Sequence, residues 1–150
     1  MKNSKLFITA AVIFVLDRIS KYLILKSKIL YYPILEKYLS ISSVSNTGAA
    51  FSTFQGQQDL LILISSLAVL FFIGYFTKHE VAVLEQFGWG LLLGGAVGNL
   101  FDRVVYNCVI DFINFECLKF PVFNVADVAI TFGTILVCYY CFFIEGKKDA

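Results

Sequence analysis

The chain has 150 residues, of which 59% are hydrophobic and 15% are charged, and its formal net charge is +1. A water-soluble domain carries about a quarter charged residues, so this composition argues against one and favours an integral membrane protein. The near-neutral charge and the lack of a Lys/Arg cluster argue against nucleic-acid binding.

The first apolar run, residues 6–25, is long enough to span a bilayer of about 30 Å as a helix. Asp17, Arg18 and Lys21 interrupt its second half, and no small-residue cleavage site follows it, so we interpret it as a retained span rather than a signal peptide. Asp17 and Lys21 share a helix face. Two interpretations stay open: Lys21 extends to the lipid headgroups, or the pair ties this helix to a polar centre.

The connection of residues 27–59 contains a predicted strand and a predicted turn. Residues 38–44 alternate enough to indicate the strand, and Asn46 and Gly48 are typical of a turn. Taken alone, these two residues fit an ordinary loop turn. The tyrosines on either side of residue 35 suit a membrane interface, where aromatic side chains gather.

The second and third spans are residues 60–76 and 86–105. The second has no charged side chain. Small residues recur every four positions along the third: Gly90, Gly94 and Gly98. Such stripes allow transmembrane helices to approach closely. Asn99 and Arg103 lie on the adjacent stripe, and Asp102 follows Gly98 by one turn. We therefore expect the helix to pack closely along most of its length and to be polar in its last turn.

The second long connection, about residues 106–123, carries Asp111 within an apolar, β-branched run. The fourth span, residues 125–144, begins after Asn124. Asn is a preferred N-cap, and an acid three residues later, here Asp127, nearly completes a capping box. Within this segment, capping is a sufficient explanation for both residues.

Four spans predict an all-α membrane protein: a four-transmembrane-helix bundle with a small β-containing extracytoplasmic loop region, forming one domain over residues 1–150. The ends of spans one and three, the start of span four and both long connections then lie at one membrane face. Ionisable groups at membrane depth are costly and mark a function by default. We therefore predict that Asp111 and Asp127 meet there as an aspartyl catalytic dyad. The lysines slightly favour cytoplasmic termini, at the opposite face.

Four segments together resemble the lipoprotein signal peptidases of bacteria (signal peptidase II). They are Asp17-x-x-x-Lys21, Asn46-x-Gly48-Ala49-Ala50-Phe51, Gly94-Gly95-Ala96-x-Gly98-Asn99-x-x-Asp102-Arg103 and Phe123-Asn124-x-Ala126-Asp127-x-x-Ile130. Their order is specific, the resemblance covers nearly the whole chain, and the block from Val109 to Phe112 also fits. It implies an intramembrane aspartyl peptidase, without metal or other cofactor, whose catalytic residues are Asp111 and Asp127.

The resemblance also implies substrates and a location. The substrates are diacylglyceryl-modified prolipoproteins, cleaved just before the lipidated cysteine, and the site opens to the outer face of the bacterial inner membrane. The expected partners are these prolipoproteins and membrane lipid, without nucleic acid, and the expected state is a monomer. Further residues are expected to bind substrate or support the site: Asp17, Lys21, Asn46, Gly48, Ala50, Phe51, Gly98, Asn99, Asp102, Arg103, Asn124 and Ala126.

One departure from the family is local: many members have a glycine shortly before the first catalytic aspartate, where this chain has Tyr106, Asn107 and Cys108. For the chemistry, two adjacent carboxylates share a proton, and a helix N-terminus favours the charged form. We therefore predict Asp127 as the resting carboxylate and Asp111 as the acid. Arg103 is expected to pair with Asp102 or to bind substrate carbonyls.

Two other function classes were weighed. A small proton-coupled transporter or channel subunit would also place ionisable residues in a bundle, but it would spread them through the membrane depth. A structural subunit leaves the acids unexplained. The remaining reactive residue types suggest little chemistry: His79 lacks partner ligands, Cys138 and Cys141 are interpreted as small hydrophobes, and Cys108 and Cys117 can pair only in an oxidising compartment.

Overall fold

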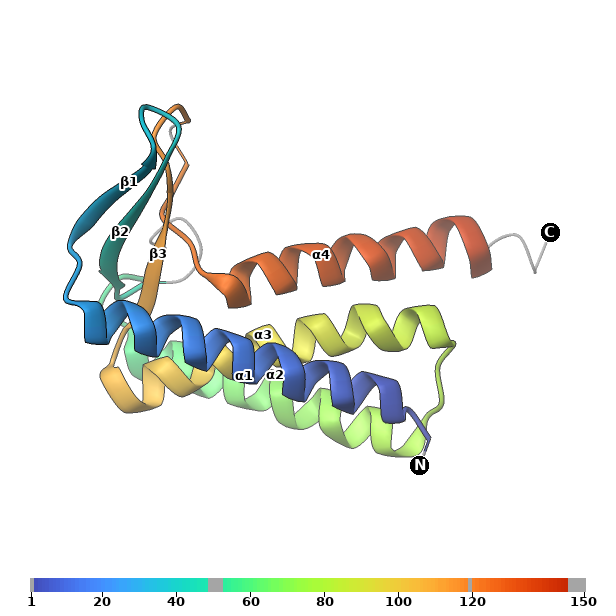
Figure 1. Cartoon of the computed structure of the whole chain (residues 1–150). Helices are drawn as coiled ribbons and strands as arrows, with labels where there is room; N and C mark the ends of the chain where they lie inside the picture. The colour runs from blue at the N-terminus through green and yellow to red at the C-terminus, as the bar shows by residue number, and fades with distance from the viewer. Residues whose placement is uncertain (1, 49–52, 119, 146–150) are drawn as a thin grey trace.

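The chain forms a bundle of helices with a small sheet at one end, as shown by a computed structural model that describes residues 2–48, 53–118 and 120–145 (Figure 1). The elements follow one another along the chain as α1 Ser4–Ser27, β1 Tyr31–Leu35, β2 Leu39–Asn46, α2 Gln58–Lys78, α3 Val83–Tyr106, β3 Val109–Phe115, α4 Val125–Tyr139 and the π-helical turn η2 Tyr140–Glu145. All four helices therefore lie where apolar spans were predicted. Helices α1, α2 and α3 extend a few residues further, whereas α4 ends at Tyr139 and the rest of the fourth predicted span is the turn η2.

The three strands form an antiparallel sheet in the order β1-β2-β3. The predicted strand over residues 38–44 is confirmed as β2. Neither β1 nor β3 was predicted, because β1 contains Pro33 and lacks alternation, and β3 is a short apolar run whose pairing with β2 only the fold supplies. The register places Val44 opposite Asp111 and fixes that aspartate at the base of the sheet.

The sheet lies at the end of the bundle where α1 and α3 finish and α4 begins (Figure 1). The start of α1 and the end of α4 lie at the opposite end, as does the turn between α2 and α3. This is the arrangement that an even number of spans predicted. It brings the polar ends of α1, α3 and α4 together beside the strands.

Helix α3 lies between α1 and α4 and packs closely on both because of its glycines. A Cβ added at Gly94 would lie 2.6 Å from the carbonyl oxygen of Ala10 in α1, and one added at Gly95 would lie 2.5 Å from that of Ala126 in α4. Any side chain at either position would separate the helices. The predicted small-residue stripe is therefore confirmed, with a second glycine face towards α4.

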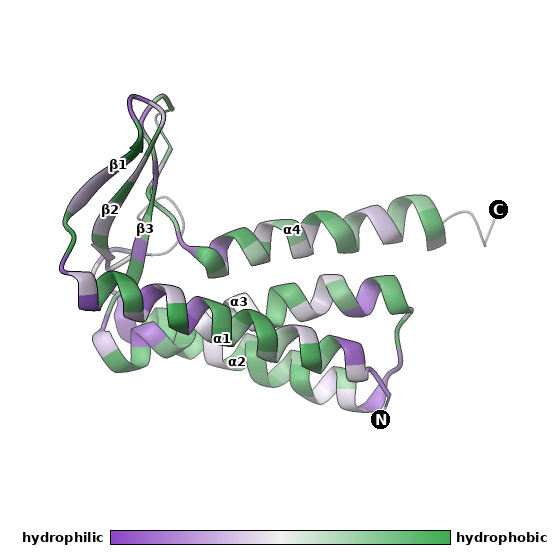
Figure 2. Cartoon of the chain, viewed as in Figure 1, coloured by the Kyte–Doolittle hydropathy of each residue, from purple (hydrophilic) through white to green (hydrophobic). Residues whose placement is uncertain are grey.

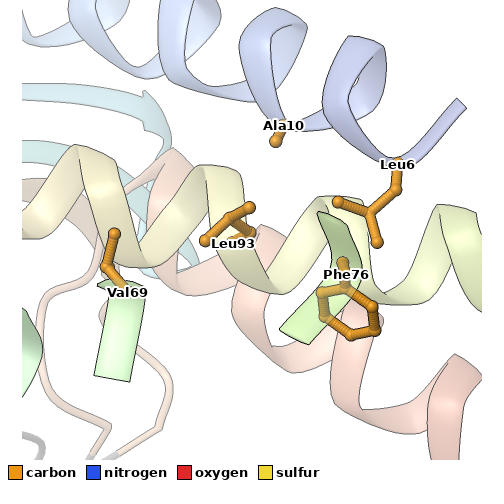
Figure 3. Packing of buried hydrophobic residues seen from close by; sticks show 5 residues of the cluster. All are labelled: Leu6, Ala10, Val69, Phe76 and Leu93. Carbon is orange, nitrogen blue, oxygen red and sulfur yellow. The ribbon is translucent and has the colours of Figure 1, made fainter. Parts of the chain in front are cut away.

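The apolar core lies between α1, α2 and α3 and extends from the middle of the bundle to the end away from the sheet (Figure 3). Its members are Leu6, Ala10, Val69, Phe76 and Leu93. Asn3 secures the same end, because its side-chain amide donates to the carbonyls of Phe76 (2.8 Å) and His79 (2.7 Å) and accepts from the N–H of Val81 (3.1 Å).

The outer surfaces of the helices are apolar, unlike those of a soluble bundle, and some of the buried side chains are charged. Hydrophobic residues predominate along the helices (Figure 2), and many large apolar side chains are exposed: Leu67 in α2 is 58% exposed and Phe132 in α4 is 62% exposed. The largest fully buried side chains include Lys21, Asp17 and Asp102. Within the described residues, two helical segments are long and apolar enough to cross a bilayer, Gln58–Lys78 and Val125–Ile144.

Candidate active site

Asp111 lies in β3 and is 2% exposed. Two side-chain amides bind its carboxylate: Asn46 donates to Oδ2 at 3.0 Å, and Asn124 donates to Oδ1 at 2.7 Å. Burial, helped by the negative charge of Asp127, raises the pKa of Asp111 to about 6, although the two amide hydrogen bonds act in the opposite direction. This carboxyl group therefore holds its proton to a higher pH than an ordinary aspartate.

Asp127 is in the first turn of α4, with Asn124 as the N-cap. The amide oxygen of Asn124 accepts from the Asp127 N–H at 2.9 Å, and the Asn124 N–H donates to Asp127 Oδ2 at 3.1 Å. The capping interpretation is thus confirmed. The other carboxylate oxygen, Oδ1, accepts from the side chain of Asn99 at 2.8 Å. The cap fixes the carboxylate without removing it from the site, because Asp127 and Asp111 line the same cavity.

Asn124 and Asn99 connect the two aspartates. The Asn124 amide nitrogen that binds Asp111 also donates to Asn99 Oδ1 at 3.1 Å, and Asn99 in turn binds Asp127. The ammonium of Lys21 donates to Asn99 Oδ1 at 3.0 Å. With its oxygen held by two donors, Asn99 presents its NH₂ group to Asp127.

The cavity has a volume of about 500 Å³ and is bounded by α2, α3, α4 and the segment before α4. Its polar walls include Asn46, Asn99 and Arg103 beside the aspartates. The remaining lining is largely apolar: Ile64, Ala68, Ala96, Val109, Phe120, Pro121, Val122, Phe123 and Ile130, with Ser65 and Thr131. An apolar chamber with polar groups at one end suits a ligand that is part lipid and part peptide.

Asp17 and Lys21 form the buried pair that one of the two sequence interpretations predicted. Lys21 Nζ lies 3.0 Å from Asp17 Oδ1 and 2.7 Å from Asp102 Oδ2, and its side chain is 1% exposed. The alternative, in which Lys21 extends to the headgroups, is therefore wrong. A buried ammonium requires nearby carboxylates, and Asp17 and Asp102 supply them.

Two roles were expected for Arg103, and the first of them, pairing with Asp102, does not form, because the Asp102 carboxylate binds Arg18 and Lys21 of α1. Arg103 instead donates to the backbone oxygens of Gly48 at 3.2 Å and Asn99 at 3.4 Å. Its guanidinium faces the cavity and interacts electrostatically with both site aspartates. The cation that pairs with Asp102 in its place, besides Lys21, is Arg18, which the sequence analysis did not select. The one available signal was its position beside Asp17.

Small residues let these groups approach. A Cβ at Gly98 would lie 2.6 Å from Asp17 Oδ2, and the fully buried Ala126 donates its N–H to Asp17 Oδ1 at 3.2 Å. Gly48 donates its N–H to Asn46 Oδ1 at 2.9 Å, which confirms the predicted turn. Ala50 and Phe51, also expected at the site, lie outside the described residues.

The departure from the family pattern before Asp111 has a simple structural solution. Asn107 ends α3 in the left-handed conformation, with φ 57°, and its N–H donates to the Arg103 carbonyl at 3.0 Å. Asn is among the non-glycine residues that adopt this conformation most readily. The chain can therefore turn from α3 into β3 here without a glycine.

The other reactive side chains lie apart from the cavity. Cys108, Cys117 and Cys138 are free thiols, and Cys138 and Cys141 are exposed on the outer surface of the last helical segment. His79 is exposed and stacks on Tyr75, with ring centroids 4.5 Å apart. Among the described residues, no three His, Cys, Asp or Glu side chains are grouped so as to hold a metal ion.

Comparison with known proteins identifies relatives over almost the full length. The family profile described as signal peptidase (SPase) II matches residues 9–143. The lipoprotein signal peptidase of Clostridioides difficile (strain 630) is 35% identical, covering 89% of this chain and 91% of its own length. That of Nostoc punctiforme is 39% identical, covering 91% and 89%. A bacterial membrane enzyme solved by the in meso method at 2.3 Å superposes with a TM-score of 0.84 at 28% identity, covering 91% of this chain and 86% of its own.

Proposed function

This chain belongs to the signal peptidase II family, and we propose that it removes the signal peptide from diacylglyceryl-modified prolipoproteins by cleaving before the lipidated cysteine. The observation that carries the mechanism is the placement of Asp111 and Asp127 on one cavity, each bound by amides that are hydrogen-bonded to one another. Two carboxyl groups at one site are the chemistry of an aspartic peptidase.

In the proposed reaction, Asp127 is ionised and Asp111 is protonated. Asp127 takes a proton from a water molecule, whose oxygen attacks the scissile carbonyl carbon. Asp111 donates a hydrogen bond to the carbonyl oxygen and stabilises the tetrahedral intermediate. The intermediate collapses when the leaving nitrogen receives the proton that Asp127 took. The raised pKa of Asp111 supports the assignment of acid to this residue, as does the position of Asp127 at a helix N-terminus.

Arg103 is suited to hold the substrate backbone. Its Nε is buried and makes no hydrogen bond within the described part of the chain, while its terminal nitrogens bind only backbone oxygens of the protein. A guanidinium at the cavity wall then has donor capacity for peptide carbonyls. Its charge also offsets the single negative charge of a dyad that retains one proton.

The exterior of the bundle supports a bilayer location with four spans. All four helices present exposed apolar side chains, and the ionisable groups are enclosed near the sheet end. We place that end at the outer membrane face and the termini in the cytoplasm, following the slight lysine excess at the termini. The diacylglyceryl chains would lie along the apolar cavity wall between α2 and α4, near Ile64 and Ile130, and the enzyme would act as a monomer.

A proton-coupled transporter fits less well. Between Leu60 and Thr77, α2 has no charged side chain, and neither do α4 and η2 between Val128 and Ile144. The buried charges of α1 and α3, Asp17, Lys21 and Asp102, lie in the second half of each helix, which runs towards the sheet. A polar path across the membrane would need ionisable side chains in the half of the bundle away from the sheet as well.

The test is cleavage of a diacylglyceryl-modified precursor by purified protein. Asp111→Asn and Asp127→Asn should each lower kcat by at least about 10²-fold, the scale of general acid–base catalysis, while the protein remains folded. Asp59→Asn, at an exposed acid in the first turn of α2, is the matched control and should retain activity. Normal turnover by Asp111→Asn, or proton flux in liposomes without cleavage, would contradict the proposal.

A further inference from the structure

Behind the cavity, two carboxylates and two cations form a closed, neutral cluster. Lys21 Nζ bridges Asp17 Oδ1 (3.0 Å) and Asp102 Oδ2 (2.7 Å). Arg18 bridges the other two oxygens, with Nη2 at 2.6 Å from Asp17 Oδ2 and Nη1 at 2.5 Å from Asp102 Oδ1. All four carboxylate oxygens therefore have a cationic partner. Both carboxylates are 0% exposed, so their charges must be compensated within the protein.

The two carboxylates of this cluster hold the backbone next to the site aspartates. Asp102 Oδ2 accepts the N–H of Ile110 at 3.2 Å, and Ile110 directly precedes Asp111. Asp17 Oδ1 accepts the N–H of Ala126 at 3.2 Å, and Ala126 directly precedes Asp127. Asp102 and Asp17 thus each bind the backbone N–H of the residue that precedes a proposed catalytic aspartate. The cluster connects strand β3 and helix α4 through α1 and α3.

Arg18 controls the orientation of both carboxylates. Lys21 and the backbone N–H groups all bind Oδ1 of Asp17 and Oδ2 of Asp102, on one side of each carboxylate. Only Arg18 among these partners holds the opposite oxygens. Its guanidinium is itself fixed by a hydrogen bond to the Gly98 carbonyl at 3.2 Å and lies 4.7 Å from the centroid of the Phe101 ring. A carboxylate held at both oxygens cannot rotate away from its N–H donor.

We propose that Arg18 is a positioning residue for the peptidase reaction. By binding Asp17 Oδ2 and Asp102 Oδ1, it fixes the two carboxylates that accept the N–H groups of Ala126 and Ile110. It thereby sets the separation of Asp127 and Asp111. The inference rests on the proposed function. Arg18 is not among the residues that line the cavity, so we assign it no contact with substrate. Its effect is exerted on the geometry of the dyad, where small displacements are costly to catalysis.

The test compares Arg18→Gln with Arg18→Lys and with Lys26→Gln, a control at an exposed cation on the same helix. Lys21 still bridges both carboxylates in Arg18→Gln, which favours folding. We expect this variant to lower kcat by about tenfold or more with little change in KM, since geometry and not substrate contact is altered. Arg18→Lys, which keeps the positive charge but lacks the two guanidinium nitrogens that bind the two carboxylates, should recover part of kcat. Lys26→Gln should match the wild type.

Amide hydrogen exchange separates positioning from general stability. In Arg18→Gln, protection should fall at Ile110 and Ala126 more than along α2. Wild-type kcat, or loss of protection and activity uniformly with the folded fraction, would overturn the inference. The two proposals fail in different ways: active Asp111→Asn contradicts the dyad itself, whereas inactive Asp111→Asn beside fully active Arg18→Gln contradicts only the role of Arg18.

Discussion

The side-chain nitrogen of Asn124 lies 2.7 Å from Oδ1 of Asp111, while the oxygen of the same amide caps helix α4 at the N–H of Asp127. One residue therefore starts the helix that carries one aspartate and binds the carboxylate of the other. A helix cap is usually a local device. Here it also links strand β3 and helix α4, which only the fold brings together. The two roles of Asn124, as helix cap and as hydrogen-bond donor to Asp111, can therefore be tested separately by mutation.

Asn124→Ser and Asn124→Ala should separate these two roles. Serine caps helices about as well as asparagine but is too short to keep the bond to Asp111, so we expect kcat to fall with little loss of stability. Alanine loses both bonds and should cost a further ~1 kcal/mol of stability from the lost cap. Thermal unfolding and kcat are measured on both variants. Equal activity in Asn124→Ser and the wild type would contradict the role of this amide at Asp111.

The pH dependence of kcat/KM should report Asp111. Burial raises its pKa to about 6, so the acid form predominates below that pH and the carboxylate above it. Because only the protonated form donates a hydrogen bond to the substrate oxygen, kcat/KM should decline as pH rises through about 6. The profile is measured with the purified enzyme by varying the concentration of the lipid-modified precursor at each pH. A steady increase between pH 6 and 8 would rule out Asp111 as the acid.

Asn46→Ala should move that decline to higher pH. The Asn46 amide donates to Asp111 Oδ2 at 3.0 Å and stabilises the charged carboxylate, which lowers the pKa of Asp111. Removing this donor raises the pKa, so the proton is kept to a higher pH. The midpoint of the profile is compared with that of wild type, and a shift in the opposite direction would contradict the assignment.

Gly98→Ala and Gly74→Ala should have opposite effects on stability. A Cβ at Gly98 meets Asp17 Oδ2 at 2.6 Å and displaces the buried charge cluster, so we expect a loss of roughly 1–3 kcal/mol together with lower kcat. At Gly74, within α2, a Cβ meets nothing within 4 Å. Alanine there should be neutral or stabilise by up to about 1 kcal/mol through helix propensity. Unfolding in detergent is the measurement, and equal stabilities would contradict the packing role of Gly98.

Asn3→Ala should affect stability without affecting the chemistry. The side chain satisfies two carbonyls and one N–H at the turn between α2 and α3, at the end of the bundle away from the site. Leaving these buried groups unpaired should cost about 1–3 kcal/mol. The kcat per folded molecule should equal that of wild type, measured below the unfolding transition. A fall in kcat would mean that the two ends of the bundle are coupled.

The sequence by itself determined the four helices, the strand over residues 38–44, the glycine stripe and the end of the molecule at which the polar residues gather. These features depend on local patterns: the length of apolar runs, the spacing of small residues and the direction of each span. The same reasoning selected Asp111 and Asp127, because charged residues are scarce in so apolar a chain. Both line one cavity, as that selection requires.

Only the tertiary structure decided which partner each charge takes. Asp102 and Arg103 are neighbours in sequence, but they leave α3 in different directions, so Asp102 binds Arg18 and Lys21 while Arg103 faces the cavity. Strand β3 and the link from Asn124 to Asp111 likewise depend on contacts between segments far apart in the chain. Apolar periodicity fixes which segments are helices, but it does not fix their rotation about one another. Ion pairs and hydrogen bonds form or fail within a few tenths of an ångström, so they are decided by packing.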